Sequence, residues 1–205
     1  LFVGSFFLGL MILNKIYKRE GKDPAVLDTL LIYIMVGAVL GSRLVHCFFY
    51  EPVYYLNRPA EIFQIWQGGL ASHGAAIGII IALYFYSRGR DDQKFLWVLD
   101  RISIAAALGG SLIRLGNLFN SEIIGTECLL PWAFVFPRAV GGDLLLRHPT
   151  MIYESVAYLL IFFILLGIYL RQGDRVPGGE LIGIFLITVF SSRLLIEFVK
   201  VRQAA

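Results

Sequence analysis

The fold is decided by a junction between two stretches of sequence, ISIAAALGGSLI at residues 102–113 and RLGNLFNSEIIG at residues 114–125. The first stretch contains no charged residue, whereas the second begins with an arginine and soon adds two asparagines and a glutamate. A charged side chain in lipid costs about 2.5 kcal/mol or more at mid-depth and less near the surface, so such residues are seldom without a role. The junction therefore predicts a membrane helix that ends in a polar site.

A helix through this junction would place Arg114, Asn117 and Ser121 on one face, because they are spaced at i, i+3 and i+7. That face would present a fixed cation and amide groups, which are the donors that an anionic headgroup requires. The alternative is an arginine at the lipid boundary whose charge snorkels to the surface, followed by a polar exit loop.

The composition indicates a membrane protein, because 58% of the 205 residues are hydrophobic and only 16% are charged, with a mean hydropathy of +0.73. A soluble domain averages about 25% charged residues. We expect an all-α fold, a polytopic membrane helical bundle in a single domain over residues 1–205, since open strands cannot span lipid. The net charge of +3 is small and the cations lie in short groups, which argues against a nucleic-acid partner.

About six apolar segments are expected to cross the membrane, bounded by charged residues, proline or glycine. Residues 120–147 form the longest piece outside these spans, a loop or arm in which residues 132–136 alternate as a short strand or an interfacial segment would. Cys47 is expected in the core, and its pairing with Cys128 stays open. The expected spans cover residues 1–16, 26–50, 68–87, 95–119, 149–170 and 181–199.

The basic residues predict the orientation, because cytoplasmic loops carry an excess of lysine and arginine. The richer side collects Lys15, Lys18, Arg19, Lys22, Arg88, Arg90, Lys94, Arg171 and Arg175. The poorer side has Arg58, Arg138, Arg147, Lys200 and Arg202. The side that is poorer in basic residues is therefore expected to face outward. His73, Arg114, His148 and Arg193 are expected on that side.

The third span opens with small residues, GGLASHGAA at residues 68–76, which would let another helix or a ligand approach its backbone closely. His73 is the only histidine, lysine, arginine, aspartate or glutamate of that span before Arg88. Histidine titrates near neutral pH and can therefore act as a general base. The structural alternative is a histidine hydrogen-bonded to a neighbouring helix.

The fifth span opens with His148 and Pro149, and Tyr153 and Glu154 follow within its first turns. These residues can bind a ligand together, but Glu154 can also simply complement the helix dipole, and Tyr153 can anchor the interface.

Arg193 and Glu197 lie at i, i+4 on the sixth span, where a salt bridge is the simplest interpretation. A paired arginine still has donors for a phosphate. Arg43 in the second span is a candidate of the same kind. Arg101 is expected to snorkel at the cytoplasmic end, and His46 to pack in the core.

These residues outline a site in which arginines bind an anion and a histidine or glutamate accepts a proton. The sequence contains no Gly-x-Ser-x-Gly, His-Glu-x-x-His or Walker motif, which argues against serine-hydrolase, zincin and nucleotide-driven chemistry.

Four motifs in this order resemble the bacterial prolipoprotein diacylglyceryl transferase family. The most specific is Arg-Leu-Gly-Asn at residues 114–117 with Asn120, Glu122 and Gly125. The others are Gly68-Gly69 with Ser72-His73-Gly74, His148-Pro149 with Tyr153-Glu154, and Arg193 with Glu197.

The chain also departs from the family pattern. Ile113 stands where a small residue usually precedes the signature arginine, Ala75 follows Gly74 in place of a second glycine, and Val189 replaces a tyrosine. A tyrosine-glycine pair at the start of the first span and a seventh span after Arg193 are absent. We expect either a chain trimmed at both ends or a shortened member.

The resemblance implies transfer of a diacylglyceryl group from phosphatidylglycerol to the cysteine thiol in a prolipoprotein signal peptide. The products are a thioether and glycerol phosphate, and the expected place is the bacterial inner membrane, with the site towards the periplasm. No metal or organic cofactor is implied; the partners are the two substrates and membrane lipid.

Within that reaction, Arg114 and Arg193 are expected to hold the phosphate and Asn117 and Asn120 to orient the glycerol. His73 is the candidate base and Glu122 a second one. The other expected binding residues are Gly125, Arg43, His148, Tyr153, Glu154 and Glu197. Two alternatives remain open: another membrane enzyme that acts on phospholipid headgroups, and a non-enzymatic lipid carrier or scaffold.

Overall fold

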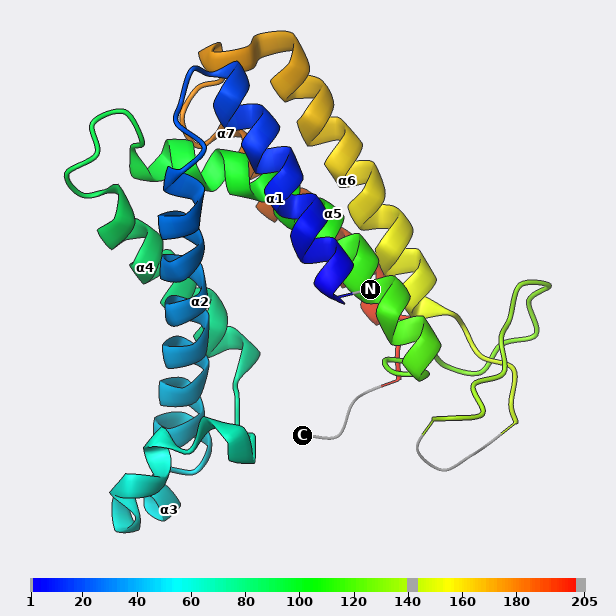
Figure 1. The fold of residues 1–205 in the computed structure, drawn as a ribbon. Coiled ribbons are helices and arrows are strands. Elements are labelled where there is room, and N and C mark those ends of the chain that lie inside the picture. Colours follow the sequence, from blue (N-terminus) through cyan, green and yellow to red (C-terminus); the bar gives the residue numbers. More distant parts are fainter. Residues whose placement is uncertain (1, 140–143, 202–205) are drawn as a thin grey trace. The chain divides into compact units, whose positions relative to one another are not determined.

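The computed structural model describes residues 2–139 and 144–201, and within them regular structure is helical throughout, so the all-α prediction is confirmed (Figure 1). The chain forms two compact units, one of Asp23–Val98 and the other of Leu1–Lys22 with Leu99–Ala205. That both units belong to a single domain stays a prediction.

The unit Asp23–Val98 is built on two antiparallel helices, α2 (Val26–Val45) and α4 (Ser72–Ser87). Their backbones meet at glycines, because a Cβ on Gly41 would overlap the carbonyl oxygen of Gly74 and a Cβ on Gly37 would lie 2.6 Å from the carbonyl oxygen of Gly78. The predicted close approach of another helix to the small residues of the third span is thus confirmed. α4 begins only at Ser72, since Gly68 and Gly69 have positive φ angles that interrupt a helix.

Arg43 fastens the connection between these two helices. The connection contains a short π-helix at His46–Tyr50, the helix α3 (Pro52–Asn57) and two short 3-10 helices, Pro59–Phe63 and Ile65–Gln67. The guanidinium of Arg43 is buried and donates hydrogen bonds to the backbone carbonyls of Ile62 at 2.8 Å, Gly68 at 2.6 Å and Glu61 at 2.6 Å. Cys47 is buried, as expected, whereas His46 is only partly buried, beside the rings of Tyr50 and Tyr55.

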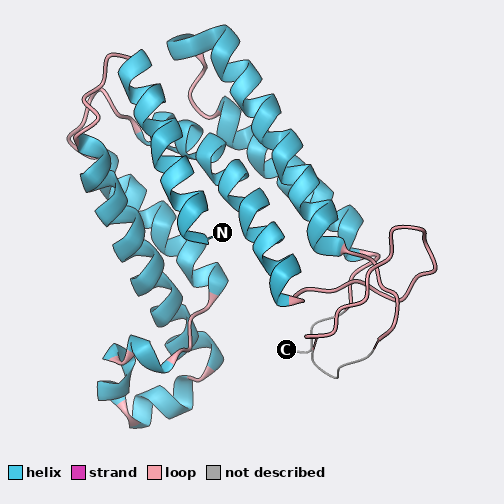
Figure 2. Cartoon of the chain, turned by 45° about the vertical axis from the view of Figure 1, so that its right-hand side comes forward, coloured by secondary structure: helices cyan, strands magenta, loops and turns pink. Residues whose placement is uncertain are grey.

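The other unit contains α1 (Phe2–Arg19), most of α5 (Phe95–Asn120), α6 (Thr150–Gln172) and α7 (Glu180–Glu197). Figures 1 and 2 show α1, α5 and α6 running side by side. The hydroxyls of Ser111 on α5 and Ser155 on α6 each donate to the other residue's backbone carbonyl, at 2.9 and 3.0 Å. One turn of α6 beyond Ser155, the ring of Tyr158 lies against Gly110 of α5. A Cβ on Gly110 would come within 2.8 Å of that ring. These contacts fix the register of α5 against α6.

The end of this unit near Arg101 is closed by buried charges. Arg101 is only 1% exposed and binds both carboxylate oxygens of Glu20, at 3.0 and 3.1 Å. The carboxylate of Asp100 accepts hydrogen bonds from the backbone N–H groups of Gly179, at 2.7 Å, and Ile182, at 2.9 Å, and so caps α7. The expectation that Arg101 snorkels was wrong, because a buried carboxylate binds it inside the protein.

The described part of the arm is loop, held by single backbone bridges (Figure 2). Phe134 and Arg147 exchange two backbone hydrogen bonds, at 3.0 and 2.9 Å, and Gly125 pairs with Lys200. Residues 132–136 therefore contribute one bridge and no strand. Residues 140–143 of the predicted arm lie outside the described residues.

Three helical segments are long and apolar enough to cross a membrane, Val26–Tyr50, Phe95–Asn120 and Thr150–Arg175, and the described residues include a shorter apolar helix, Ser72–Ser87. Helices α1 and α7 have 18 residues each and carry charges near an end. The structure thus describes a membrane protein, and the count of about six spans stays a prediction.

Candidate functional site

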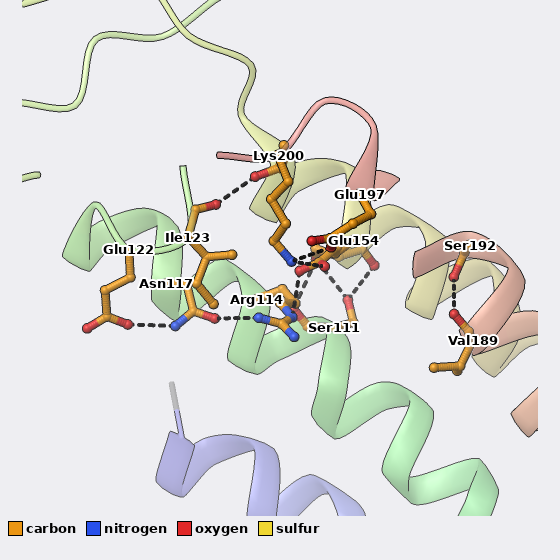
Figure 3. Close-up of polar contacts among 12 residues, drawn as sticks. Ser111, Arg114, Asn117, Glu122, Ile123, Glu154, Val189, Ser192, Glu197 and Lys200 are labelled. Atoms are coloured by element: carbon orange, nitrogen blue, oxygen red, sulfur yellow. Dashed lines mark hydrogen bonds and ion pairs between the residues drawn. The ribbon is translucent and has the colours of Figure 1, made fainter. Parts of the chain in front are cut away.

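A buried glutamate held between two cations lies where α5, α6 and the segment after α7 meet (Figure 3). The Nε of Arg114 lies 2.8 Å from Oε2 of Glu154, and the Nζ of Lys200 lies 2.9 Å from Oε1 of the same carboxylate. The side chain of Glu154 is 1% exposed, that of Lys200 9%, and that of Arg114 16%. Arg114 is thus the member of this trio that is most accessible to a ligand.

The asparagines of residues 114–125, the signature stretch, extend this trio towards the arm. Nη1 of Arg114 donates a long hydrogen bond of 3.5 Å to Oδ1 of Asn117, whose Nδ2 donates to Glu122 at 2.7 Å (Figure 3). Asn120 donates to the other carboxylate oxygen of Glu122 at 3.3 Å. The predicted shared face of Arg114 and Asn117 is confirmed, but Ser121 is not part of it. α5 ends at Asn120, and Ser121 has a φ of 57°, outside the helical range.

Gly125 allows the arm to pack tightly against the start of α6. Its N–H donates to the carbonyl of His148 at 3.0 Å, and a Cβ at this position would lie 2.5 Å from the Cβ of His148. The hydroxyl of Thr150 donates to the carbonyl of Ile123 at 2.6 Å. A residue larger than glycine would push the signature stretch away from α6, which gives the predicted Gly125 a structural reason.

His148 and Tyr153 contact each other at the outer surface of this packing. The Tyr153 hydroxyl accepts a hydrogen bond of 2.8 Å from the indole N–H of Trp132 and lies 3.2 Å from Nδ1 of His148. A hydroxyl can accept from one neighbour and donate to the other. The three side chains therefore form one polar chain from the arm to α6.

The late arginine is placed differently from the expectation. Arg193 is exposed, and the described side chains form no ion pair between it and Glu197. Glu197, 61% exposed, lies 4.0 Å from Lys200 instead. The predicted salt bridge between Arg193 and Glu197 was therefore wrong, and no other residue in the described part of the chain pairs with the guanidinium of Arg193.

The remaining predicted residues, His73 and Arg43, belong to the unit Asp23–Val98. His73 is the second residue of α4 and its side chain is exposed. Arg43 directs its nitrogens to backbone carbonyls of the connection described above. In this structure Arg43 shapes the loop before α4, and a direct contact with substrate stays a prediction.

Lys200 is a residue of this cluster that was not predicted from the sequence. It was predicted only as one of the charges that set the orientation. The available signal was its spacing of three residues after Glu197, which suits an i, i+3 contact. Nothing in the sequence relates Lys200 to Glu154. As for metals, the described ranges 2–139 and 144–201 contain no group of three or more histidine, cysteine, aspartate or glutamate residues suited to holding an ion.

The fold and this site together define a class: a helical membrane protein with a partly open cationic cluster suited to an anionic group. The family model described as prolipoprotein diacylglyceryl transferase matches residues 1–205. The chain belongs to this family, as its motifs predicted.

Curated relatives agree with the family model, and three of them are named phosphatidylglycerol–prolipoprotein diacylglyceryl transferase. The protein from Chloroherpeton thalassium is 52% identical over 203 residues, which are 99% of this chain and 75% of the relative. The protein from Tolumonas auensis is 46% identical over 205 residues, 100% of this chain and 78% of the relative. The protein from Porphyromonas gingivalis is 43% identical over 208 residues, 98% of this chain and 74% of the relative.

Proposed function

We propose that this protein transfers the diacylglyceryl group of phosphatidylglycerol to the cysteine thiol of a prolipoprotein, the first step of lipoprotein maturation. The observation that carries this function is family membership over residues 1–205. In the reaction, the sulfur forms a bond to the terminal glyceryl carbon of the lipid, and the bond from that carbon to the phosphate oxygen breaks. The electron pair leaves with glycerol phosphate, and the thiol proton passes to a base.

The phosphate of the lipid is the group that the Arg114 cluster suits. The leaving phosphate gains negative charge as the carbon–oxygen bond breaks, so donors aimed at its oxygens stabilise the transition state more than the ground state. Arg114 uses Nε for Glu154 and Nη1 for Asn117, so Nη2 is available to a phosphate oxygen. Arg193 supplies a second guanidinium, and Asn117 and Asn120 orient the glycerol.

The remaining predicted residues shape the binding site. His148, Tyr153 and Gly125 position the arm beside the lipid, and Glu154 and Glu197 hold the cations. Arg43 shapes the loop before α4.

The thiol must lose its proton to attack, because the thiolate is the nucleophile. His73 is the proposed base, since it is exposed at the start of α4. Glu122 is the second candidate, although its carboxylate is already bound by two asparagines. The variants His73→Gln and Glu122→Gln, compared across pH, separate the two. The variant that lacks the base loses transfer at neutral pH and recovers part of it at higher pH, where more of the substrate thiol ionises.

The cluster is proposed to face the periplasm in the inner membrane, because the opposite side collects the larger share of basic residues. The arm offers a native reporter, since Cys128 is a free, partly exposed cysteine and Cys47 is free but buried. A membrane-impermeant thiol reagent applied to intact spheroplasts should label Cys128. Labelling that requires disrupted membranes would place the arm on the cytoplasmic side. A Cys128→Ser variant measures the background.

Mass spectrometry of a synthetic lipoprotein signal peptide, incubated with this protein and isotope-labelled phosphatidylglycerol, tests the function. We expect a peptide mass gain of one diacylglyceryl unit and release of glycerol phosphate, and no gain with a peptide whose cysteine is replaced by serine. A carrier would release the lipid unchanged. Another headgroup enzyme would consume the lipid and leave the peptide unmodified, and either result would overturn the proposal.

A further inference from the structure

Lys200 lies in an unusual position for a lysine near a membrane surface, because it points at a carboxylate inside the protein. Its side chain is 9% exposed, and Nζ lies 2.9 Å from Oε1 of Glu154, which is 1% exposed. A lysine at a membrane boundary ordinarily extends its charge to water. The orientation of Lys200 towards a buried anion therefore calls for an explanation beyond solvation.

The charges of the cluster supply that explanation. Arg114 and Glu154 alone would cancel, and a neutral pair has little attraction for an anionic phosphate. Lys200 adds a second cation against the single carboxylate, so the trio keeps one net positive charge. Glu197 also approaches Lys200, at 4.0 Å, but it is 61% exposed, and water screens most of its effect. The carboxylate of Glu122 accepts hydrogen bonds from the amides of Asn117 and Asn120, so it is not counted in the charge of the trio.

The backbone around Lys200 holds this charge in place from two sides. Lys200 lies three residues beyond the end of α7, and its N–H donates to the carbonyl of Glu197 at 3.2 Å. The flanking residues Val199 and Val201 pair with the loop after α5, through hydrogen bonds of 2.9 Å from the N–H of Thr126 to the carbonyl of Val199 and 3.3 Å from the N–H of Val201 to the carbonyl of Ile124. The loop after α5, which carries Gly125, thus sets where Lys200 lies.

We propose that Lys200 is a positioning residue of the lipid-phosphate site. It neutralises Glu154, so that the charge of Arg114 is available to the phosphate of the anionic lipid. This inference rests on the proposed function only for the identity of that lipid. Glu154, in turn, holds Arg114 through the ion pair of 2.8 Å with its Nε, which leaves Nη2 for the substrate.

The test compares three variants of the full-length protein: Lys200→Met, Lys200→Arg, and the double variant Lys200→Met with Glu154→Gln. Lys200→Met leaves Arg114 and Glu154 as a neutral pair, so we expect KM for phosphatidylglycerol to rise at least about tenfold with a much smaller change in kcat. Lys200→Arg keeps the charge and should stay near the wild type. The double variant restores one net positive charge and should recover most of the lost affinity.

Binding of phosphatidylglycerol to the detergent-solubilised variants is measured beside turnover, with thermal unfolding as the control for folding. Rescue by the double variant would not occur if Lys200 were only a structural tie, because that variant lacks both partners of the tie. A double variant as weak as Lys200→Met, or a Lys200→Met variant with unchanged KM and lipid binding, would overturn the inference. A wild-type protein that binds the lipid without transferring it would overturn the proposed function, and the binding series would still decide the role of Lys200.

Discussion

Helix α5 carries two arginines, each paired with a buried glutamate, and the two pairs have opposite characters. Arg101 and Arg114 lie roughly 20 Å apart along the helix. Arg101 is 1% exposed and its partner Glu20 is 3% exposed, with the ring of Tyr169 alongside. Arg114 is 16% exposed, and its partner Glu154 also forms an ion pair with Lys200. The closed pair joins the end of α1 to α5, whereas the open pair leaves an accessible guanidinium edge in a trio with one net positive charge.

This contrast predicts the largest effect for loss of the closed arginine. Arg101→Met leaves the carboxylate of Glu20 buried without its cation, which costs roughly 3–5 kcal/mol of stability. Thermal unfolding of the purified protein in detergent should therefore shift to a markedly lower temperature. The transfer rate per folded molecule should not change, because Arg101 is at the other end of α5 from the proposed site. A variant that unfolds normally but has lost its activity would reverse the roles of the two pairs.

The open arginine should show the converse pattern. Arg114→Gln removes the charge and the donors that we propose bind the phosphate, and loss of such donors typically lowers kcat by about 100- to 1,000-fold. Stability should fall much less than in Arg101→Met, since Lys200 still pairs with Glu154. Transfer to the signal peptide and thermal unfolding are measured on the same preparation. Near-normal transfer by this variant would contradict the assignment of the site.

A smaller effect is expected from the cap at the closed end. Asp100→Ala removes the acceptor of the N–H groups of Gly179 and Ile182, and the loss of an N-terminal cap costs about 1–2 kcal/mol. Asp100→Asn retains one acceptor oxygen and should cost less. Unfolding curves for the two variants check this order. Equal stability of the alanine variant and the wild type would show that water replaces the cap without loss.

The smallest effect is expected at the arm beside the open pair. Tyr153→Phe removes the hydroxyl that links Trp132 and His148, a loss of about 1 kcal/mol at most sites. Because the hydroxyl orders the arm, we expect a modest rise in KM for the signal peptide and little change in kcat. An equal fall in kcat and kcat/KM would instead indicate that Tyr153 acts in the chemical step.

The helices were predictable from the sequence because their boundaries depend on local patterns. The span predicted at residues 95–119 is α5, Phe95–Asn120, and that at residues 149–170 is α6, Thr150–Gln172. The third span was predicted to begin too early, at residue 68, because its apolar and small residues hide two glycines with positive φ. Ser121 was assigned to the helical face for a similar reason, since spacing alone does not show where a helix ends.

The polar contacts were less predictable, because their partners are distant in sequence. Glu20 and Arg101 are separated by 81 residues, and Glu154 and Lys200 by 46. No periodicity marks such pairs, so Arg101 was expected to snorkel and Lys200 was overlooked. The nearby pair Arg193 and Glu197 had ideal spacing and yet does not form, because helical spacing allows a salt bridge without requiring one. The motifs located Arg114, Asn117 and Glu154, but only the structure shows their hydrogen bonds.

The most direct test of the contrast is the same conservative change at both arginines, Arg101→Lys and Arg114→Lys, with transfer rate and unfolding temperature measured for each. Lysine keeps the charge but loses the planar fork that binds two oxygens at once. We predict that Arg114→Lys loses most of its transfer rate and keeps its stability, while Arg101→Lys loses stability and keeps its rate per folded molecule. A normal transfer rate in Arg114→Lys, with or without a change in stability, would contradict the claim that the guanidinium of Arg114 binds the lipid phosphate.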